Sequence, residues 1–271
     1  MAEIVGGYAL SHSSFMVSRP DLVTEDVAAR CYAAYERVRG ELAELRPDAL
    51  ILIGTDHFNT FSYDAMPQWC VGRGDSYEGW ADNIPMYKVP GAPLLSADII
   101  SSLLRQGFEP SFSDAMRLDH SFMSPLHFVV PEMNIPVVPI FQNCITRPML
   151  SLRRALALGN ALREAVASSH VDARVVIIGS GGLSHWLGGP EHGRVSSEFD
   201  REFLDRFVAG DEEWLTGFTD DDIERLAGNG GHEIRNWLTV RGCLPSGPVE
   251  VLYYETIPSW FVGAGVARLQ R

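Results

Sequence analysis

The sequence predicts an α/β fold with a mostly parallel central sheet flanked by helices, in one domain with a helical excursion near the C-terminus. Residues 49–54, Ala-Leu-Ile-Leu-Ile-Gly, form the unbroken apolar run of a strand that is buried on both faces. Strand-like and helix-like segments alternate along the chain, which favours parallel strands joined by helical crossovers. The chain of 271 residues shows no linker or repeat, so we expect residues 1–271 to form a single domain.

The first third of the chain reads as strand, helix and strand, followed by a loop. We expect a strand at 3–10, a helix at 24–45 that begins after Thr24, and the second strand at 49–54. A shorter strand follows at 67–72. The stretch from 72 to 93 is rich in Gly, Asp and Pro, which indicates a long loop near the site.

The middle of the chain continues the alternation. We expect a helix at 94–106, a strand at 136–142, a helix at 150–168 and a strand at 173–179. Pro139 lacks the amide hydrogen that a central strand uses, so it predicts an edge strand or a bulge at this point.

The region from 196 to 242 reads as helical and polar-faced. Three short helices are expected, at 196–208, 219–227 and 232–241, before strand character returns at 249–255. This region is the helical excursion of the predicted domain.

Composition excludes several classes of protein. The formal net charge of −13 argues against a nucleic-acid or anionic-membrane surface, because both need basic patches. The sequence shows neither a signal-peptide pattern nor an apolar run long enough to span a bilayer, so we expect a cytoplasmic protein. Four cysteines stand apart from any CxxC pair and are expected to be buried, reduced thiols: Cys31, Cys70, Cys144 and Cys243.

Two histidines follow strand-like runs and make a candidate metal centre. His12 follows the run at 3–10 and His57 the run at 49–54. Either could be an ordinary strand-end histidine, but imidazoles at neighbouring strand ends can reach one ion. Glu233, after Gly230-Gly231-His232, is the candidate anionic ligand. From spacing alone, a first-turn glutamate facing the helix dipole is the favoured interpretation.

Two further histidines are candidates for proton handling. His120 lies in Leu-Asp-His-Ser-Phe, and His185 follows the turn Gly179-Ser180-Gly181-Gly182. An imidazole with a pKa near its usual value accepts and returns protons at neutral pH. No GxGxxG, P-loop or Gly-x-Ser-x-Gly pattern is present, so nucleotide binding and an α/β-hydrolase triad lack support. His232 stays an open candidate.

With these residues assembled, the chain resembles the class III extradiol ring-cleavage dioxygenases, the superfamily of the protocatechuate 4,5-dioxygenase β subunit. The resemblance is greatest to the branch that cleaves 2,3-dihydroxyphenylpropionate. Several motifs carry it in order along nearly the whole chain: Leu10-Ser11-His12-Ser13, Asp56-His57-Phe58-Asn59, Phe61-Ser62-Tyr63-Asp64-Ala65-Met66-Pro67, Asp119-His120-Ser121-Phe122, Gly179-Ser180-Gly181-Gly182-Leu183-Ser184-His185, His232-Glu233-Ile234 and Ile257-Pro258-Ser259-Trp260.

The resemblance implies an enzyme that holds Fe(II) with His12, His57 and Glu233. It gives His185 the acid–base role and His120 a second proton-handling or hydrogen-bonding role. The implied reaction is extradiol cleavage of a catecholic ring with O2, both oxygen atoms being incorporated. A 3-substituted catechol such as 2,3-dihydroxyphenylpropionate is the implied substrate. Homo-oligomerisation is implied too, and relatives that act on protocatechuate use a small helical partner subunit.

One departure from the family pattern leaves the substrate open. Only Trp186 to Ser196 separates the Gly-Leu-Ser-His motif from the next helix, a stretch that is longer in the dihydroxyphenylpropionate enzymes. A second departure is Ser121, where the family usually has glycine, and it should leave His120 in place. Protocatechuate, gallate, aminophenol or hydroxypyridone types are alternative substrates. A binding protein that has lost catalysis is the remote alternative. For an acidic substituent, Arg73, Lys88, Arg235 and Arg241 are candidate partners, and the sequence does not choose among them.

Overall fold

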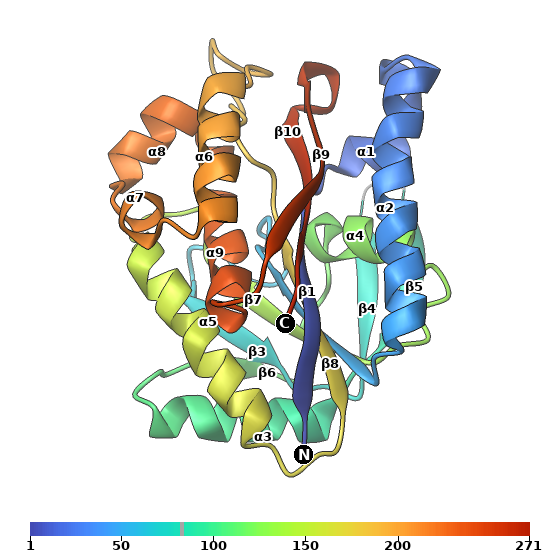
Figure 1. Cartoon of the computed structure of the whole chain (residues 1–271), viewed down its shortest axis with the longest axis vertical. Helices are drawn as coiled ribbons and strands as arrows, with labels where there is room; N and C mark the ends of the chain where they lie inside the picture. The colour runs from blue at the N-terminus through green and yellow to red at the C-terminus, as the bar shows by residue number, and fades with distance from the viewer. Residues whose placement is uncertain (82–83) are drawn as a thin grey trace.

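The computed structural model describes the backbone of residues 1–81 and 84–271 and the side chains of residues 1–79 and 86–271. Its core is an eight-stranded sheet in the order β6-β3-β7-β2-β8-β1-β10-β9, with β4 and β5 as a separate hairpin (Figure 1). The strands are β1 (Glu3–Leu10), β2 (Ala49–Gly54), β3 (Trp69–Gly72), β4 (Ser76–Ala81), β5 (Ile84–Pro90), β6 (Ser111–Ser113), β7 (Val137–Gln142), β8 (Arg174–Ser180), β9 (Val249–Ile257) and β10 (Val262–Leu269).

The predicted fold class is confirmed. The four strands that carry the centre of the sheet, β7-β2-β8-β1, run parallel to one another. Antiparallel strands are added at both flanks, since β3 pairs with β7 and β10 pairs with β1 in that sense. The helices that connect them are α1 (Ser14–Ser18), α2 (Glu25–Leu45), α3 (Pro93–Arg105), α4 (His120–Val129), α5 (Leu152–Ala167), α6 (Ser197–Ala209), α7 (Glu212–Thr216), α8 (Asp220–Ala227) and α9 (Ile234–Cys243).

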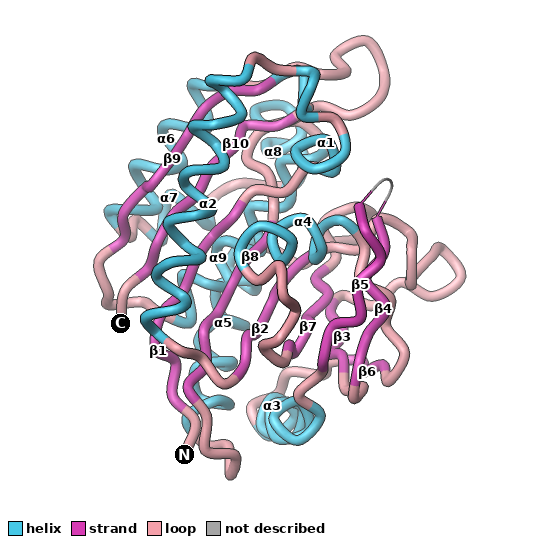
Figure 2. The backbone as a smooth tube through the Cα atoms, turned by 90° about the vertical axis from the view of Figure 1, so that its right-hand side faces the viewer, coloured by secondary structure: helices cyan, strands magenta, loops and turns pink. Residues whose placement is uncertain are grey.

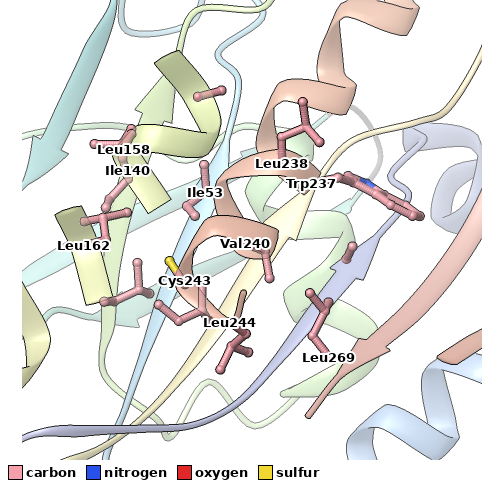
Figure 3. Close-up of a cluster of buried hydrophobic side chains, with 14 of the residues drawn as sticks. Ile53, Ile140, Leu158, Leu162, Trp237, Leu238, Val240, Cys243, Leu244 and Leu269 are labelled. Atoms are coloured by element: carbon pink, nitrogen blue, oxygen red, sulfur yellow. The ribbon is translucent and has the colours of Figure 1, made fainter. Parts of the chain in front are cut away.

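Helices cover both faces of the sheet, which explains the unbroken apolar run of β2. One apolar cluster joins the sheet to α3, α5 and α9, and a second joins it to α2 and α4 on the other face (Figure 2). Figure 3 shows side chains of α9 and α5 packed over neighbouring strands. The labelled residues are Ile53, Ile140, Leu158, Leu162, Trp237, Leu238, Val240, Cys243, Leu244 and Leu269. Burial on both faces is what a continuously apolar parallel strand requires.

The expectation of a long loop between residues 72 and 93 was wrong. Strands β4 and β5 pair there as an antiparallel hairpin, and Asp82 and Asn83 lie outside the described residues. The side chains of Tyr77 and Val89 are buried in the core, and they supply the apolar contact that stabilises the hairpin. Frequent Gly, Asp and Pro concealed this pairing in the sequence.

Three other expectations need correction. Strand β7 is central, not an edge, although it contains Pro139. Its pairing with β3 ends at Val71 and Ile140, one residue before Pro139, and a side chain at Gly72 would meet the proline ring. Strand β10 was missed because Gly263, Ala264 and Gly265 hide its strand character. Helix α9 is buried along its whole length, so the region from 196 to 242 is not polar-faced throughout.

The four cysteines are free and buried, as expected for reduced thiols. Among the described residues, no helix combines the length and apolar character that a bilayer span requires.

Candidate metal centre and active site

The parallel strands deliver three of the predicted histidines to one edge of the sheet. His12 follows β1, His57 follows β2 and His185 follows β8, and these three strands are neighbours in the order β2-β8-β1. Their carboxyl ends therefore meet, which is where open α/β sheets place their sites. Glu233 ends a short 3-10 turn (Gly230–Glu233) that leads into α9, and His120 begins α4.

Glu233 lies at the centre of the cluster. Its Oε1 is 3.1 Å from Nε2 of His12 and 3.5 Å from Nε2 of His57. The ring of His120 stacks on that of His57 at 4.0 Å between centroids. Candidate ligand atoms of His12, His57 and His120 also lie within 4.8 Å of one another. The structure thus brings together the residues that the sequence singled out, with His120 beside the two imidazoles.

Hydrogen bonds fix which nitrogen of each imidazole faces Glu233. The Ser180 hydroxyl donates to the carbonyl of Ser121 at 2.5 Å, so it accepts from Nδ1–H of His12 at 2.9 Å. Asp119 Oδ2 accepts from Nδ1–H of His57 at 2.8 Å. When a ring is neutral, it therefore presents the lone pair of Nε2 to the site, which is the form that binds a metal.

This arrangement fits a divalent cation. Two nitrogen lone pairs and a carboxylate oxygen face one another at 3.1 and 3.5 Å, and acceptors so close need a positive charge between them. Ligands about 2.1 Å from a metal and at right angles to each other stand about 3.0 Å apart, close to these separations. Two histidines and one carboxylate on one side of an ion leave its other positions open.

The electrostatics of the protein alone agree with this assignment. Burial would raise the pKa of Glu233, but the neighbouring His12 and His57 hold it well below its usual range, so the residue is a carboxylate. Burial would lower the pKa of His57, yet Asp119 and Glu233 together raise it to about 10. The carboxylates of the site thus attract positive charge. In the metal-free protein, a proton on His57 supplies that charge.

His185 lies on the other side of Glu233. Its Nε2 is 4.0 Å from Oε2 of Glu233, and its Nδ1–H donates to the carbonyl of Leu183 at 3.0 Å. Burial lowers the pKa of His185, so the ring is neutral, with the lone pair of Nε2 directed to the site. Burial and the positive charge of His57 likewise lower the pKa of His120 to about 3. Two neutral imidazoles thus flank the candidate metal ligands.

The glycines around the site allow backbone and side chains to approach closely. A Cβ at Gly230 would lie 2.0 Å from Nε2 of His185, and one at Gly181 would lie 2.7 Å from Cβ of Glu233. Neither position accepts a larger residue without displacing a candidate functional group. Glycine in these two motifs is therefore required by packing, and not by nucleotide binding.

A strained turn follows His57. Phe58 has φ +59°, a left-handed conformation that is rare for a bulky residue. The buried Asp56 carboxylate stabilises it by accepting hydrogen bonds from the backbone amides of Asn59, Thr60 and Phe61 at 2.9–3.0 Å. The turn exposes the Phe58 ring at the cavity beside His57.

Sequence reasoning missed the residues that orient the histidines. Asp119 and Ser180 belong to the recognised motifs, but nothing in their spacing shows that they bond to His57 and His12. His232 does not face the site: its Nδ1 accepts from Arg235 at 2.9 Å and its Nε2 lies 3.3 Å from Glu224. It therefore has a structural role in the described protein.

Known proteins resemble this chain over nearly its whole length. A family model described as the catalytic LigB subunit of aromatic ring-opening dioxygenase matches residues 6–266. A 2,3-dihydroxyphenylpropionate/2,3-dihydroxicinnamic acid 1,2-dioxygenase from Paraburkholderia xenovorans (strain LB400) is 31% identical, covering 94% of each chain. One of the same description from Rhodococcus jostii (strain RHA1) is 28% identical, covering 95% of this chain and 96% of the relative.

Among solved structures, an uncharacterized protein from Escherichia coli K12 has a similar fold. The TM-score is 0.64 at 15% sequence identity, over 98% of this chain and 99% of that one. The family match spans nearly the whole chain and includes every candidate residue described above. The chain belongs to the LigB family of aromatic ring-opening dioxygenases and is an extradiol ring-cleavage dioxygenase.

Proposed function

We propose that residues 1–271 form one catalytic domain that uses Fe(II), held by His12, His57 and Glu233, to cleave a catecholic ring beside one of its hydroxyls. Both atoms of O2 enter the product. The observation that carries the proposal is the convergence of two Nε2 lone pairs on one oxygen of a buried carboxylate, at 3.1 and 3.5 Å. Fe(II) in a site of two histidines and one carboxylate supplies open positions at which diol and O2 react side by side.

Hydrogen bonds from neighbouring residues fix the orientation of the candidate ligands before any substrate binds. Ser180 and Asp119 fix the rings of His12 and His57 with Nε2 inward. The backbone amide of Gly182 donates to Oε2 of Glu233 at 2.6 Å, which leaves Oε1 directed toward the two histidines. Ligands fixed in this way need no rearrangement on binding.

His185 and His120 are the proposed proton carriers. A catechol binds more strongly when one hydroxyl has lost its proton, and the free Nε2 lone pair of His185 can accept it. The same nitrogen can return that proton to oxygen later in the reaction, when the O–O bond breaks. His120, neutral and stacked on His57, hydrogen-bonds the substrate from the other side. Removing one such acid–base group typically costs about 10²–10⁴ in rate.

The experiment that tests this proposal compares two substitutions with a control. Protein loaded with Fe(II) without oxygen is mixed with catechols and air, and the coloured ring-fission product is followed by absorbance. We expect His57→Ala to lose tight iron binding, and His185→Ala to keep iron yet lose most turnover. His170→Ala changes an exposed histidine outside the site and should behave like the parent. Parental turnover in both site variants would refute these assignments.

The choice among catechol types is part of the same proposal. A panel that includes 2,3-dihydroxyphenylpropionate, protocatechuate, gallate and an aminophenol, compared by kcat/KM, identifies the substrate type. We also propose that the enzyme is a homo-oligomer, and a small partner subunit is the alternative. Light scattering on purified protein, with activity measured on the same sample, tests that part.

A further inference from the structure

A small cavity of about 140 Å³ opens beside the proposed catalytic residues. His57, His185 and Glu233 form its inner end. The outer wall is apolar, because it is made of Phe58, Ile145 and Leu187. A molecule that reaches the catalytic end must therefore carry its remaining atoms along this wall.

Two wall residues are unusually exposed for their type. Phe58 is 42% exposed and Leu187 is 41% exposed, and the ring of Tyr63 packs on that of Phe58 at 5.1 Å between centroids. Large apolar side chains that gather at the mouth of a cavity mark a surface that binds something apolar. The strained backbone of Phe58 presents its ring there.

The polar groups of the outer wall are already engaged. The side-chain amide of Asn229 exchanges two hydrogen bonds with the backbone of Leu187, at 2.8 and 2.9 Å. The Cys144 thiol lies 3.6 Å from the side-chain oxygen of Asn236. The thiol is a weak donor and the amide keeps one further N–H, and neither group supplies the positive charge that pairs with a carboxylate.

No lysine or arginine lines this cavity among the described residues, and Arg147 and Arg194, which follow two of its lining segments along the chain, are paired. Arg147 bridges Asp221 and Glu224, at 2.6 and 2.9 Å. Arg194 pairs with Glu191 and lies over the ring of Trp186. A carboxylate placed in this cavity would lose its hydration without gaining a cation.

The cationic candidates named from the sequence lie elsewhere. Arg73 pairs with Asp114, Arg235 is buried against Asp220, and Arg241 donates to the carbonyl of Leu244. Lys88 lines a separate, wider groove together with Arg117, and none of the catalytic residues lines that groove.

From these contacts we propose that the site takes catechols whose ring substituent is uncharged and apolar, such as a short alkyl chain, in preference to a carboxylate. This inference rests on the proposed function. It separates the chain from the relatives that are named for 2,3-dihydroxyphenylpropionate, an acid. The wall of Phe58, Ile145 and Leu187 is the specificity-determining surface.

The first test compares compounds that differ only in charge. Iron-loaded enzyme is given 3-(2,3-dihydroxyphenyl)propionate, its methyl ester and 3-propylcatechol, and kcat/KM is measured for each. Binding constants are measured in parallel without oxygen. We expect the neutral compounds to be preferred by about tenfold or more, in both kcat/KM and binding. An acid that matches or exceeds its ester in both measurements would overturn the inference and leave the proposed function intact.

A second test moves a charge into the wall. Leu187→Arg places a cation at the cavity mouth, and Leu187→Gln is the matched neutral control. We expect the arginine variant to shift the ratio of acid to ester by about tenfold toward the acid, and the glutamine variant to leave it near the parental value. Equal shifts in the two variants would overturn the inference.

A third variant tests Arg117, the arginine that lines the separate groove together with Lys88. Arg117→Met should leave the acid-to-ester ratio unchanged, because Arg117 lines the separate groove. A selective loss of acid cleavage in this variant would show that a cation does serve the substrate, against the inference. If no catechol of any charge is cleaved by iron-loaded protein, the proposed function itself fails.

Discussion

Substituting Asp119 tests whether the metal centre depends on the orientation of His57. The carboxylate is buried and holds three donors: Oδ2 accepts from the backbone amide and from Nδ1 of His57, both at 2.8 Å, and Oδ1 accepts from the amide of Ser121 at 2.9 Å. In Asp119→Asn, one oxygen becomes an amide nitrogen. The arrangement that keeps both bonds to His57 places this nitrogen against the Ser121 amide, where no acceptor is available.

The magnitude follows from those contacts. Losing the N-terminal cap of α4 costs about 1 kcal/mol of folding free energy. The His57 ring keeps its tautomer, but its Nδ1–H now donates to a neutral oxygen, which makes Nε2 a weaker ligand. Removing such an outer-shell partner weakens metal binding by about 10- to 100-fold. That range corresponds to roughly 1.4–2.8 kcal/mol.

Two measurements separate these effects. Fe(II) affinity is measured without oxygen by competition with a chelator, and the metal-free protein is unfolded in urea. Ser151→Ala is the matched control, because Ser151 is the N-terminal cap of α5. Its side-chain hydroxyl accepts a hydrogen bond from the backbone amide of Arg154. We expect Ser151→Ala to lose about 1 kcal/mol of stability. Asp119→Asn should lose more, because in the metal-free protein it also removes the buried ion pair with His57, and it alone should lose iron affinity. Iron affinity within twofold of the parent in Asp119→Asn would show that Asp119 only caps the helix.

Three further predictions test other parts of the structure. In Gly230→Ala the new methyl group would displace the His185 ring, so turnover should fall while iron affinity stays; normal turnover would contradict the packing argument. Burial raises the pKa of Asp200 to about 7, so the folded state holds a proton that the unfolded chain releases near pH 4. The free energy of unfolding of the parent should therefore fall by up to about 4 kcal/mol between roughly pH 4 and pH 8, and Asp200→Asn should escape this loss. An equal change in the two proteins, measured by urea unfolding across that range, would refute the prediction. Leu162→Ala opens a cavity in the core and should cost about 2–5 kcal/mol without changing iron affinity, and a smaller loss would mean that α5 can collapse onto the gap.

The sequence predicted the parts of this protein that depend on local pattern. Buried parallel strands are apolar throughout, so β2 and β8 could be located, and their carboxyl ends placed His57 and His185 near one another. Helices α2 and α5 were located within two residues of their ends from apolar periodicity. Glu233 could be tied to the centre only through the family resemblance, since a first-turn glutamate has the same local pattern.

What the sequence could not predict depends on contacts between distant segments. The hairpin of β4 and β5 is stabilised by burial of Tyr77 and Val89 and not by strand propensity. The bond from Asp119 to His57 joins residues far apart in the chain, and so does the apolar wall that Phe58 and Leu187 form. Such pairings follow from how the sheet and its loops close, which periodicity does not describe.

The packing of α9 explains how a site built from separate loops can be rigid. The side chain of Asn236 donates to the carbonyl of Ser180 at 2.7 Å, and the indole of Trp237 donates to the carbonyl of Gly181 at 3.0 Å. These bonds join the helix that follows Glu233 to the end of β8, which in turn holds His12 through the Ser180 hydroxyl. Because α9 is buried between the sheet and α5, neither candidate ligand can move without disturbing the core. The geometry of the centre is thus set by core packing, and the exposed wall at Phe58 and Leu187 can vary with the substrate without altering it.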